Sequence, residues 1–156
     1  MDMTEELVIL SHLRKNAREQ LTSISKKTRI PVSTIFNKLR NQMVPLIRRH
    51  TCIIDFARIG YSTVATMIFK VDKPQKEEFR DELRKCRNVN SLQKINNGSD
   101  FLCETVFRDM KQLEDFLEGL EEKYKIRQKQ VFYHIEDIKR EEFLAEPELT
   151  DLLFKG

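Results

Sequence analysis

Hydrophobic residues recur at helical spacing in three groups within the first fifty positions, and these groups predict three short helices. The first has leucines at positions 7, 10 and 13 on one face, and we expect it from residue 2 or 4 to about residue 15. The second is expected to run from Thr22, as its N-cap, to Thr28, with residues 29–30 as the turn into the third. Three such helices in succession indicate a helix-turn-helix unit.

Pro31 opens the third predicted helix, because its fixed φ suits a first helical turn and its missing N–H is not needed there. Ile35 and Leu39 lie four residues apart and are expected to face inward. Polar and basic residues then face outward, namely Ser33, Thr34, Asn37, Lys38, Arg40 and Asn41. Side chains of these types contact base edges and phosphates in the major groove, so this helix is the candidate DNA-reading helix.

After residue 60 the pattern predicts strands as well as helices. Residues 62–71 are β-branched and apolar on both faces, which is typical of a strand covered on each side. A helix follows Pro74, two strands at about 89–95 and 101–107 flank a turn at 96–98, Asp109 caps a second helix, and a last strand spans about 127–135. This β-α-β-β-α-β order predicts a ferredoxin-like domain and an α+β fold class.

The predicted sheet carries both helices on one face, and its other face is left open. An apolar open face needs a partner, and pairing of two sheets in a homodimer would supply one. The pattern leaves the register undecided by one residue. The open face is therefore formed either by residues such as Val64, Ile68, Leu102, Val106, Val131 and Tyr133 or by their alternating neighbours.

Charge divides the chain near residue 50. Residues 1–50 carry ten Lys or Arg and four Asp or Glu, a net charge of +6, whereas residues 51–156 carry 18 and 21, a net charge of −3. Between Arg14 and His50 the acidic residues reduce to Glu19 alone. This asymmetry indicates a nucleic-acid-binding part joined to a domain with another task, and double-stranded DNA is the expected partner.

These patterns divide the chain into four predicted segments. They are a helix-turn-helix domain at 1–50, a wing and hinge at 51–61, a ferredoxin-like effector and dimerisation domain at 62–138, and an acidic tail at 139–156. Residues 45–55 are expected to form a turn and β-ribbon that place Arg48 and Arg49 against phosphate. Pro147 argues against one continuous helix in the tail.

Few features of the chain favour a cofactor or a metal ion, and we expect neither. Cys52, Cys86 and Cys103 are widely spaced, so they are expected to be buried, reduced thiols rather than a disulfide framework or a zinc site. Only four glycines are present, and none of them builds a phosphate-binding loop. No apolar run approaches the roughly 20 residues of a membrane span, so we expect a cytoplasmic protein without membrane contact.

The whole arrangement resembles the Lrp/AsnC family, the leucine-responsive regulators of bacteria and archaea, over about residues 4–142. The resemblance rests on short motifs in a characteristic order: Ile9-Leu10 with Leu13, Lys15-Asn16-Ala17-Arg18, Ile24-Ser25, Ile30-Pro31, Ser33-Thr34-Ile35, Lys38-Leu39-Arg40 and Ile59-Gly60-Tyr61. It departs from the family at Met43-Val44-Pro45, where a Gly is usual. In the hairpin loop, Asn97-Gly98-Ser99-Asp100-Phe101 keeps only the final Asp and aromatic residue of the family pattern.

The resemblance implies a sequence-specific transcription regulator that dimerises through its effector domains and assembles further into tetramers or octamers. It also implies an amino acid or related small molecule as effector, with Asn97, Gly98, Ser99 and Asp100 as candidate binding residues. The candidate DNA-binding residues are Lys26, Lys27, Arg29, Val32, Ser33, Thr34, Asn37, Lys38, Arg40, Asn41, Arg48 and Arg49.

Two alternatives share this architecture. Some proteins similar to the family are haem-pathway decarboxylases that use His and aromatic residues, but this chain lacks Trp and shows no catalytic grouping of residues, so we do not expect an enzyme. RNA-recognition motifs share the ferredoxin-like topology, but their basic-Gly-aromatic-Gly signature is absent from residues 100–107.

Overall fold

The computed structural model describes residues 4–149, which form two compact units. One unit contains the chain up to Cys52 together with the residues from Ile138 onward, and the other spans Ile53–Asp137. The acidic tail was expected as a separate segment after the effector domain. Its described part groups with the amino-terminal unit.

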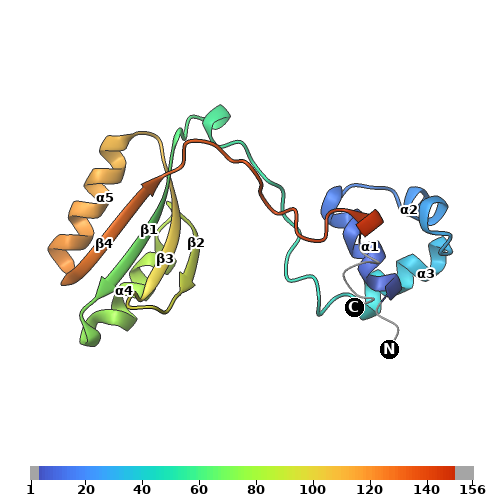
Figure 1. Ribbon diagram of the computed structural model, residues 1–156, viewed down its shortest axis with the longest axis horizontal. Coiled ribbons are helices and arrows are strands. Elements are labelled where there is room, and N and C mark those ends of the chain that lie inside the picture. Colours follow the sequence, from blue (N-terminus) through green and yellow to red (C-terminus); the bar gives the residue numbers. More distant parts are fainter. Residues whose placement is uncertain (1–3, 150–156) are drawn as a thin grey trace. The chain divides into compact units, whose positions relative to one another are not determined.

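Helices build the amino-terminal unit (Figure 1), in the order α1 (Thr4–Lys15), α2 (Leu21–Thr28) and α3 (Val32–Asn37). The chain after α3 continues directly as a π-helix, η1 (Lys38–Gln42). The N-cap of α2 is Gln20, which makes no side-chain capping hydrogen bond, so the expected capping role of Thr22 is wrong. Thr22 instead lies within the first turn of α2, as its second residue.

One apolar core holds these helices together. Its fully buried members are Ile9, Ile24, Ile35 and Met43, and Leu10, Leu13, Leu21, Leu39 and Ile47 pack around them. Arg29 ends α2 in the left-handed conformation, with φ 63°, and its N–H donates to Ser25 O at 2.8 Å. This tight turn sends the chain into α3 within three residues.

The π-helical turn brings Met43 into the core. Its backbone N–H donates to Lys38 O at 2.9 Å, a bond that spans five residues instead of four. The widened turn shifts the phase of the helix, so the side chain of Met43 becomes fully buried. The sequence periodicity, which assumes 3.6 residues per turn, could not indicate this shift.

The β-ribbon expected at residues 45–55 is wrong. Residues 47–55 contain no strand, and a short 3-10 helix, η2 (Ala57–Ile59), follows them. The exposed fractions of Ile53 and Ile54 are 62% and 47%. A ribbon needs two strands that hydrogen-bond to each other, and an isolated pair without a packed face is marginal in water.

Four strands and two α-helices build the second unit. They are β1 (Thr63–Val71), α4 (Lys76–Lys85) after the 3-10 turn η3 (Lys73–Gln75), β2 (Val89–Lys94), β3 (Phe101–Phe107), α5 (Met110–Lys123) and β4 (Ile126–Tyr133). The strand order is β2-β3-β1-β4, and every neighbouring pair is antiparallel. This is the ferredoxin-like topology, which confirms the predicted fold class.

Both helices pack on one face of this sheet (Figure 1). Phe79 and Leu83 of α4 and Leu113, Leu117 and Leu120 of α5 share a core with alternate residues of β1 and β3, from Ala65 to Val71 and from Phe101 to Phe107. Asp109 caps α5 as expected, because its Oδ1 accepts from Gln112 N–H at 2.9 Å.

The register settles which side chains occupy the open face. Val64, Thr66 and Ile68 of β1 lie opposite Val106, Glu104 and Leu102 of β3, and Thr66 lies opposite Phe132 of β4. Val131 and Tyr133 belong to the other face, since Val131 packs on the helix-side core and Tyr133 donates to Glu114 of α5. For β4, therefore, the alternating neighbours named in the sequence analysis are the open-face residues.

Candidate nucleic-acid interface and effector domain

The surface formed by α2, the turn and α3 carries most of the residues predicted to bind DNA. Lys26, Arg29, Ser33, Asn37, Arg40 and Asn41 are exposed, Val32 is 39% exposed, and Thr34 is half-buried. Arg48 and Arg49 are exposed in the segment after η1. No acidic residue occurs between Glu19 and Asp55, so this surface is entirely cationic or neutral.

Lys38 is placed differently from the other predicted residues. Its Nζ lies 2.5 Å from Glu6 Oε1 and 3.2 Å from Glu5 Oε2, and its side chain is only 16% exposed. The hydrogen bond to Glu6 raises the pKa of Lys38. Lys38 therefore links η1 to α1, and its charge is paired within the unit instead of facing outward as the sequence pattern indicated.

Two further cations of this half are paired. Lys27 Nζ lies 2.6 Å from Glu19 Oε1, and Arg14 Nη2 lies 3.0 Å from Glu141 Oε2 of the tail. Within residues 4–149, no ion pair is formed by Lys15, Arg18, Lys26, Arg29, Arg40, Arg48 and Arg49. These seven exposed side chains provide the positive surface that a polyanion would meet.

Glu19, the lone acid between Arg14 and His50, links α1 to α2. Its carboxylate accepts hydrogen bonds from Lys27 Nζ, from Ser23 Oγ at 3.0 Å and from the ring of His12 at 3.1 Å. The Lys27 hydrogen bond is the largest cause that lowers the pKa of Glu19 to about 2, and burial opposes it. The charge of Glu19 is thus held between α1 and α2 and is largely screened from the reading helix.

The predicted effector loop is tied to the sheet through its aspartate. Asp100 Oδ2 accepts from Val71 N–H at 2.9 Å, and Asp100 Oδ1 lies 2.5 Å from Lys76 Nζ. Burial alone would raise the pKa of Asp100, but these hydrogen bonds outweigh it and lower the pKa below its ordinary value. Asn97 and Gly98 are exposed, with φ 61° and 83°, and they make the tight turn at the hairpin tip.

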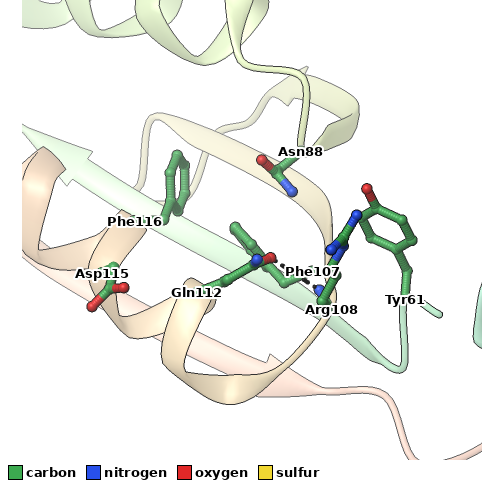
Figure 2. A pocket seen from close by; sticks show the side chains of 7 residues that line it. All are labelled: Tyr61, Asn88, Phe107, Arg108, Gln112, Asp115 and Phe116. Atoms are coloured by element: carbon green, nitrogen blue, oxygen red, sulfur yellow. Dashed lines mark hydrogen bonds between the residues drawn. The ribbon is translucent and has the colours of Figure 1, made fainter.

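An open pocket lies at the opposite end of β3 from this loop, where β3 ends and α5 begins (Figure 2). It encloses about 510 Å³ and is lined by Tyr61, Asn88, Phe107, Arg108, Gln112, Asp115 and Phe116. The Arg108 guanidinium lies 5.6 Å from the centre of the Tyr61 ring, and the rings of Phe107 and Phe116 form the apolar side. None of these residues was indicated by the sequence pattern, because three separate segments contribute them.

Comparison of the sequence with known protein families identifies the domain that Ile53–Asp137 forms. The sequence model of the Lrp/AsnC ligand binding domain matches residues 64–143, more than half of the chain. The chain belongs to the Lrp/AsnC family. This assignment confirms the resemblance found in the sequence and the interpretation as a transcription regulator with a ligand-binding domain.

Individual members of the family are distant from this Lrp/AsnC protein. An uncharacterised HTH-type transcriptional regulator of Pyrococcus furiosus is 26% identical over 121 residues, which cover 75% of this chain and 78% of that protein. The HTH-type transcriptional regulator FL11 of Pyrococcus horikoshii is 26% identical over 111 residues, which cover 70% of this chain and 74% of that protein.

Solved structures show the same fold at lower identity. A transcriptional regulator of Neisseria meningitidis, crystallised in complex with L-methionine, superposes with a TM-score of 0.81 at 20% identity and covers 90% of this chain and 93% of that chain. AsnC of Escherichia coli gives a TM-score of 0.76 at 13% identity, with 90% and 95% covered. Both matches extend over most of the two units.

Within residues 4–149, no group of three or more metal-ligating side chains gathers, and no helix has the length and apolar character to cross a bilayer. Cys103 is buried, and burial raises the pKa of its thiol to about 12. Cys86 is half-buried. Cys52 is exposed in the segment after η1 that forms no helix or strand, so the expectation of a buried thiol is wrong for this residue.

Proposed function

We propose that this protein is a sequence-specific regulator of transcription that binds double-stranded DNA through α2, the Arg29 turn and α3. The observation that carries the proposal is the exposure of Ser33 and Asn37 on α3 and of Arg40 and Asn41 on η1, which continues it, in a stretch of chain that has no acidic residue. Amide and guanidinium groups of this kind form paired hydrogen bonds with adenine and guanine edges. Family membership supports the same function.

The phosphate-binding contribution can be tested with the full chain. We expect Arg40→Ala to weaken binding and to reduce the slope of log affinity against log salt by about one, because one cation fewer releases one counterion fewer. Arg84→Ala on α4, also an exposed arginine, is the matched control and should leave both unchanged. Equal affinity and equal salt slope for wild type and Arg40→Ala would remove this surface from the interface.

Base reading requires a separate measurement. Asn37→Ala should relax base preference at one position of a selected binding site by about 1–3 kcal/mol, without a change in salt slope. Competition with duplex DNA and with single-stranded RNA separates DNA binding from the RNA-binding alternative. Displacement by RNA but not by duplex DNA would contradict the proposal.

The regulator acts as a homodimer in this proposal. The open sheet face presents the half-buried Val64, Ile68 and Leu102 and the 53% exposed Phe132 around Val106, which is already buried. Pairing of two such faces would bury this apolar surface and place two reading helices on one DNA molecule. Half-sites are then spaced by about 34 Å, one helical turn of DNA, or by a multiple of it.

The effector domain binds a small molecule, and an amino acid is the proposed class. The family model describes a ligand binding domain, and a structural neighbour was crystallised with L-methionine. Asn97, Gly98 and Ser99 stay candidates for contact with it, while Asp100 holds the loop in shape through Val71 and Lys76. Calorimetric titration with the twenty amino acids tests this, and no heat of binding from any of them would contradict it.

A further inference from the structure

The reading helix carries two apolar side chains that its polar residues do not explain. Phe36 is 51% exposed and Val32 is 39% exposed, whereas Ile35 between them is fully buried. Residues four apart lie in one row along a helix, so Val32 and Phe36 form an apolar row on α3. Ser33 and Asn37 form the next row, one residue further around the helix.

The setting of this apolar row indicates what covers it. The exposed charges on α2, the turn and α3 are all positive, since Arg29 and Arg40 flank α3 and no acid occurs between Glu19 and Asp55. The exposed acid nearest in space is Glu5 of α1, whose carboxylate is paired with Lys38. This positive charge fits a polyanion and disfavours a cationic protein partner. In the major groove of duplex DNA, the apolar group available to such a row is the 5-methyl group of a pyrimidine.

We propose that Phe36, supported by Val32, contacts thymine 5-methyl groups in the major groove and thereby requires thymine at fixed positions of the binding site. The proposal rests on the DNA-binding function proposed above and specifies which bases the helix selects. Val32 is the first residue of α3 and Phe36 the fifth. The first turns of a reading helix lie nearest the base edges, so both side chains are placed for such contacts.

The expected size of the effect follows from the area of one methyl group. Burial of a methyl-sized group stabilises by about 0.8 kcal/mol, which corresponds to about fourfold in affinity for each contacted thymine. The polar row cannot supply this preference, because thymine and uracil present the same hydrogen-bonding groups in the groove. Removal of the 5-methyl group therefore separates the apolar contribution from the polar one.

The test uses the full chain and a binding site selected from random, unmethylated duplexes, so that thymine is the only source of 5-methyl groups. Each thymine of that site is replaced in turn by uracil. Wild-type protein should lose about fourfold affinity at one or more positions of each half-site. Phe36→Ala should bind the unmodified site more weakly and lose nothing further at those same positions.

Two control variants keep the test decisive. Val44→Ala removes a 61% exposed apolar side chain of the same unit outside α3, and it should retain the full response to uracil. Asn37→Ala should also retain that response while it loses preference at another position. Because Phe36 is half exposed, its truncation should leave the thermal unfolding midpoint nearly unchanged, which shows that the variant is folded.

The possible failures can be told apart. Selective binding with no response to uracil, or an equal response in wild type and Phe36→Ala, would overturn the proposal and leave the DNA-binding function in place. A change of assembly size in Phe36→Ala by light scattering would assign the side chain to a contact between copies and would also overturn it. If no sequence is selected from the pool, the proposed function itself fails.

Discussion

Glu19 illustrates how one buried carboxylate can stabilise a small helical unit. It accepts from Lys27, Ser23 and His12, and it therefore joins the end of α1 to both turns of α2. The side chain is only 10% exposed, so its charge is stabilised by hydrogen bonds in place of water. The unit depends on this charge being present.

The stability of this protein should fall in acid through Glu19. The pKa of this carboxyl is about 2 in the fold against 4.5 for an ordinary Glu, so its contribution is complete above pH 4.5 and is lost as the pH falls towards 2. The shift of the pKa sets an upper limit of about 3 kcal/mol on the loss in the free energy of unfolding. Solvent screening at the largely exposed Lys27 makes the loss smaller than this limit. Glu19→Gln should unfold more easily at pH 7 and show a flatter profile between pH 4.5 and 2.

Urea unfolding at a series of pH values measures this contribution. Glu141→Gln, an exposed carboxylate of the same unit, is the control and should keep the wild-type pH profile. A Glu19→Gln profile parallel to wild type through that window would show that the carboxylate does not carry the acid response.

Lys38 gives a second prediction at this scale. Lys38→Met keeps the aliphatic stem but leaves Glu6, which is 10% exposed, without its cation, so we expect destabilisation by about 2 kcal/mol or more. Lys26→Met, which removes an exposed cation of α2, should change the free energy of unfolding by less than about 0.5 kcal/mol.

The DNA-binding behaviour of the two variants should also differ. Lys38→Met should leave the salt slope of binding unchanged, because Lys38 is already paired with the carboxylates of Glu5 and Glu6 and contacts no phosphate in our proposal. A salt slope reduced by one, with normal stability, would restore Lys38 to the interface.

Helices and strands were predicted from the sequence where hydrophobic periodicity and capping residues determine them. Phe101, Cys103, Thr105 and Phe107 are buried as the period of two predicted, and Asp109 caps α5 as predicted. The bounds of β3 and the start of α5 were therefore predicted from local pattern. The pairing of Lys38 with Glu6 spans 32 positions and was not accessible, because it exists only in the packed unit. The π-helical turn that buries Met43 was not predicted either, because a pattern of 3.6 residues per turn does not indicate a widened turn.

The candidate site was predicted in part. Ser33, Asn37, Arg40 and Asn41 are exposed as expected, since an outward row on a helix follows from an inward one. Phe36 was overlooked because an aromatic residue beside Ile35 reads as core from the sequence. Only the packed structure shows that it points away from the core.

The open face of the sheet, through β1, is the surface that we propose joins two copies of the chain, and a substitution on this strand tests that role. Ile68→Glu places a carboxylate at the centre of this face, next to Leu102 and opposite Gln130. Burial of an unpaired charge in a dimer costs several kcal/mol, so the variant should become monomeric, whereas its helix-side core is untouched. Light scattering measures the assembly, and circular dichroism checks that the domain is folded.

Lys111→Glu on the exposed side of α5 is the matched control and should stay dimeric. A dimeric Ile68→Glu protein would show that another surface joins the copies. The prediction is specific to this face because Ala65, Met67 and Phe69, on the opposite side of the same strand, are already buried.

At the scale of the whole molecule, the chain leaves the DNA-binding unit after Cys52 and returns to it at Ile138. Arg14 of α1 donates to the backbone oxygen and to the carboxylate of Glu141, at 2.9 and 3.0 Å. Two stretches of chain therefore connect the effector domain with the amino-terminal unit.

This return of the chain determines where a probe or a fusion partner can be attached. Residues 4 and 149, the first and last that the structure describes, both belong to the amino-terminal unit, so a fluorophore attached beside either of them reports on that unit. A fluorophore meant to report on the effector domain alone must be placed within Ile53–Asp137. The exposed Lys111 of α5 offers such a position away from the candidate effector loop.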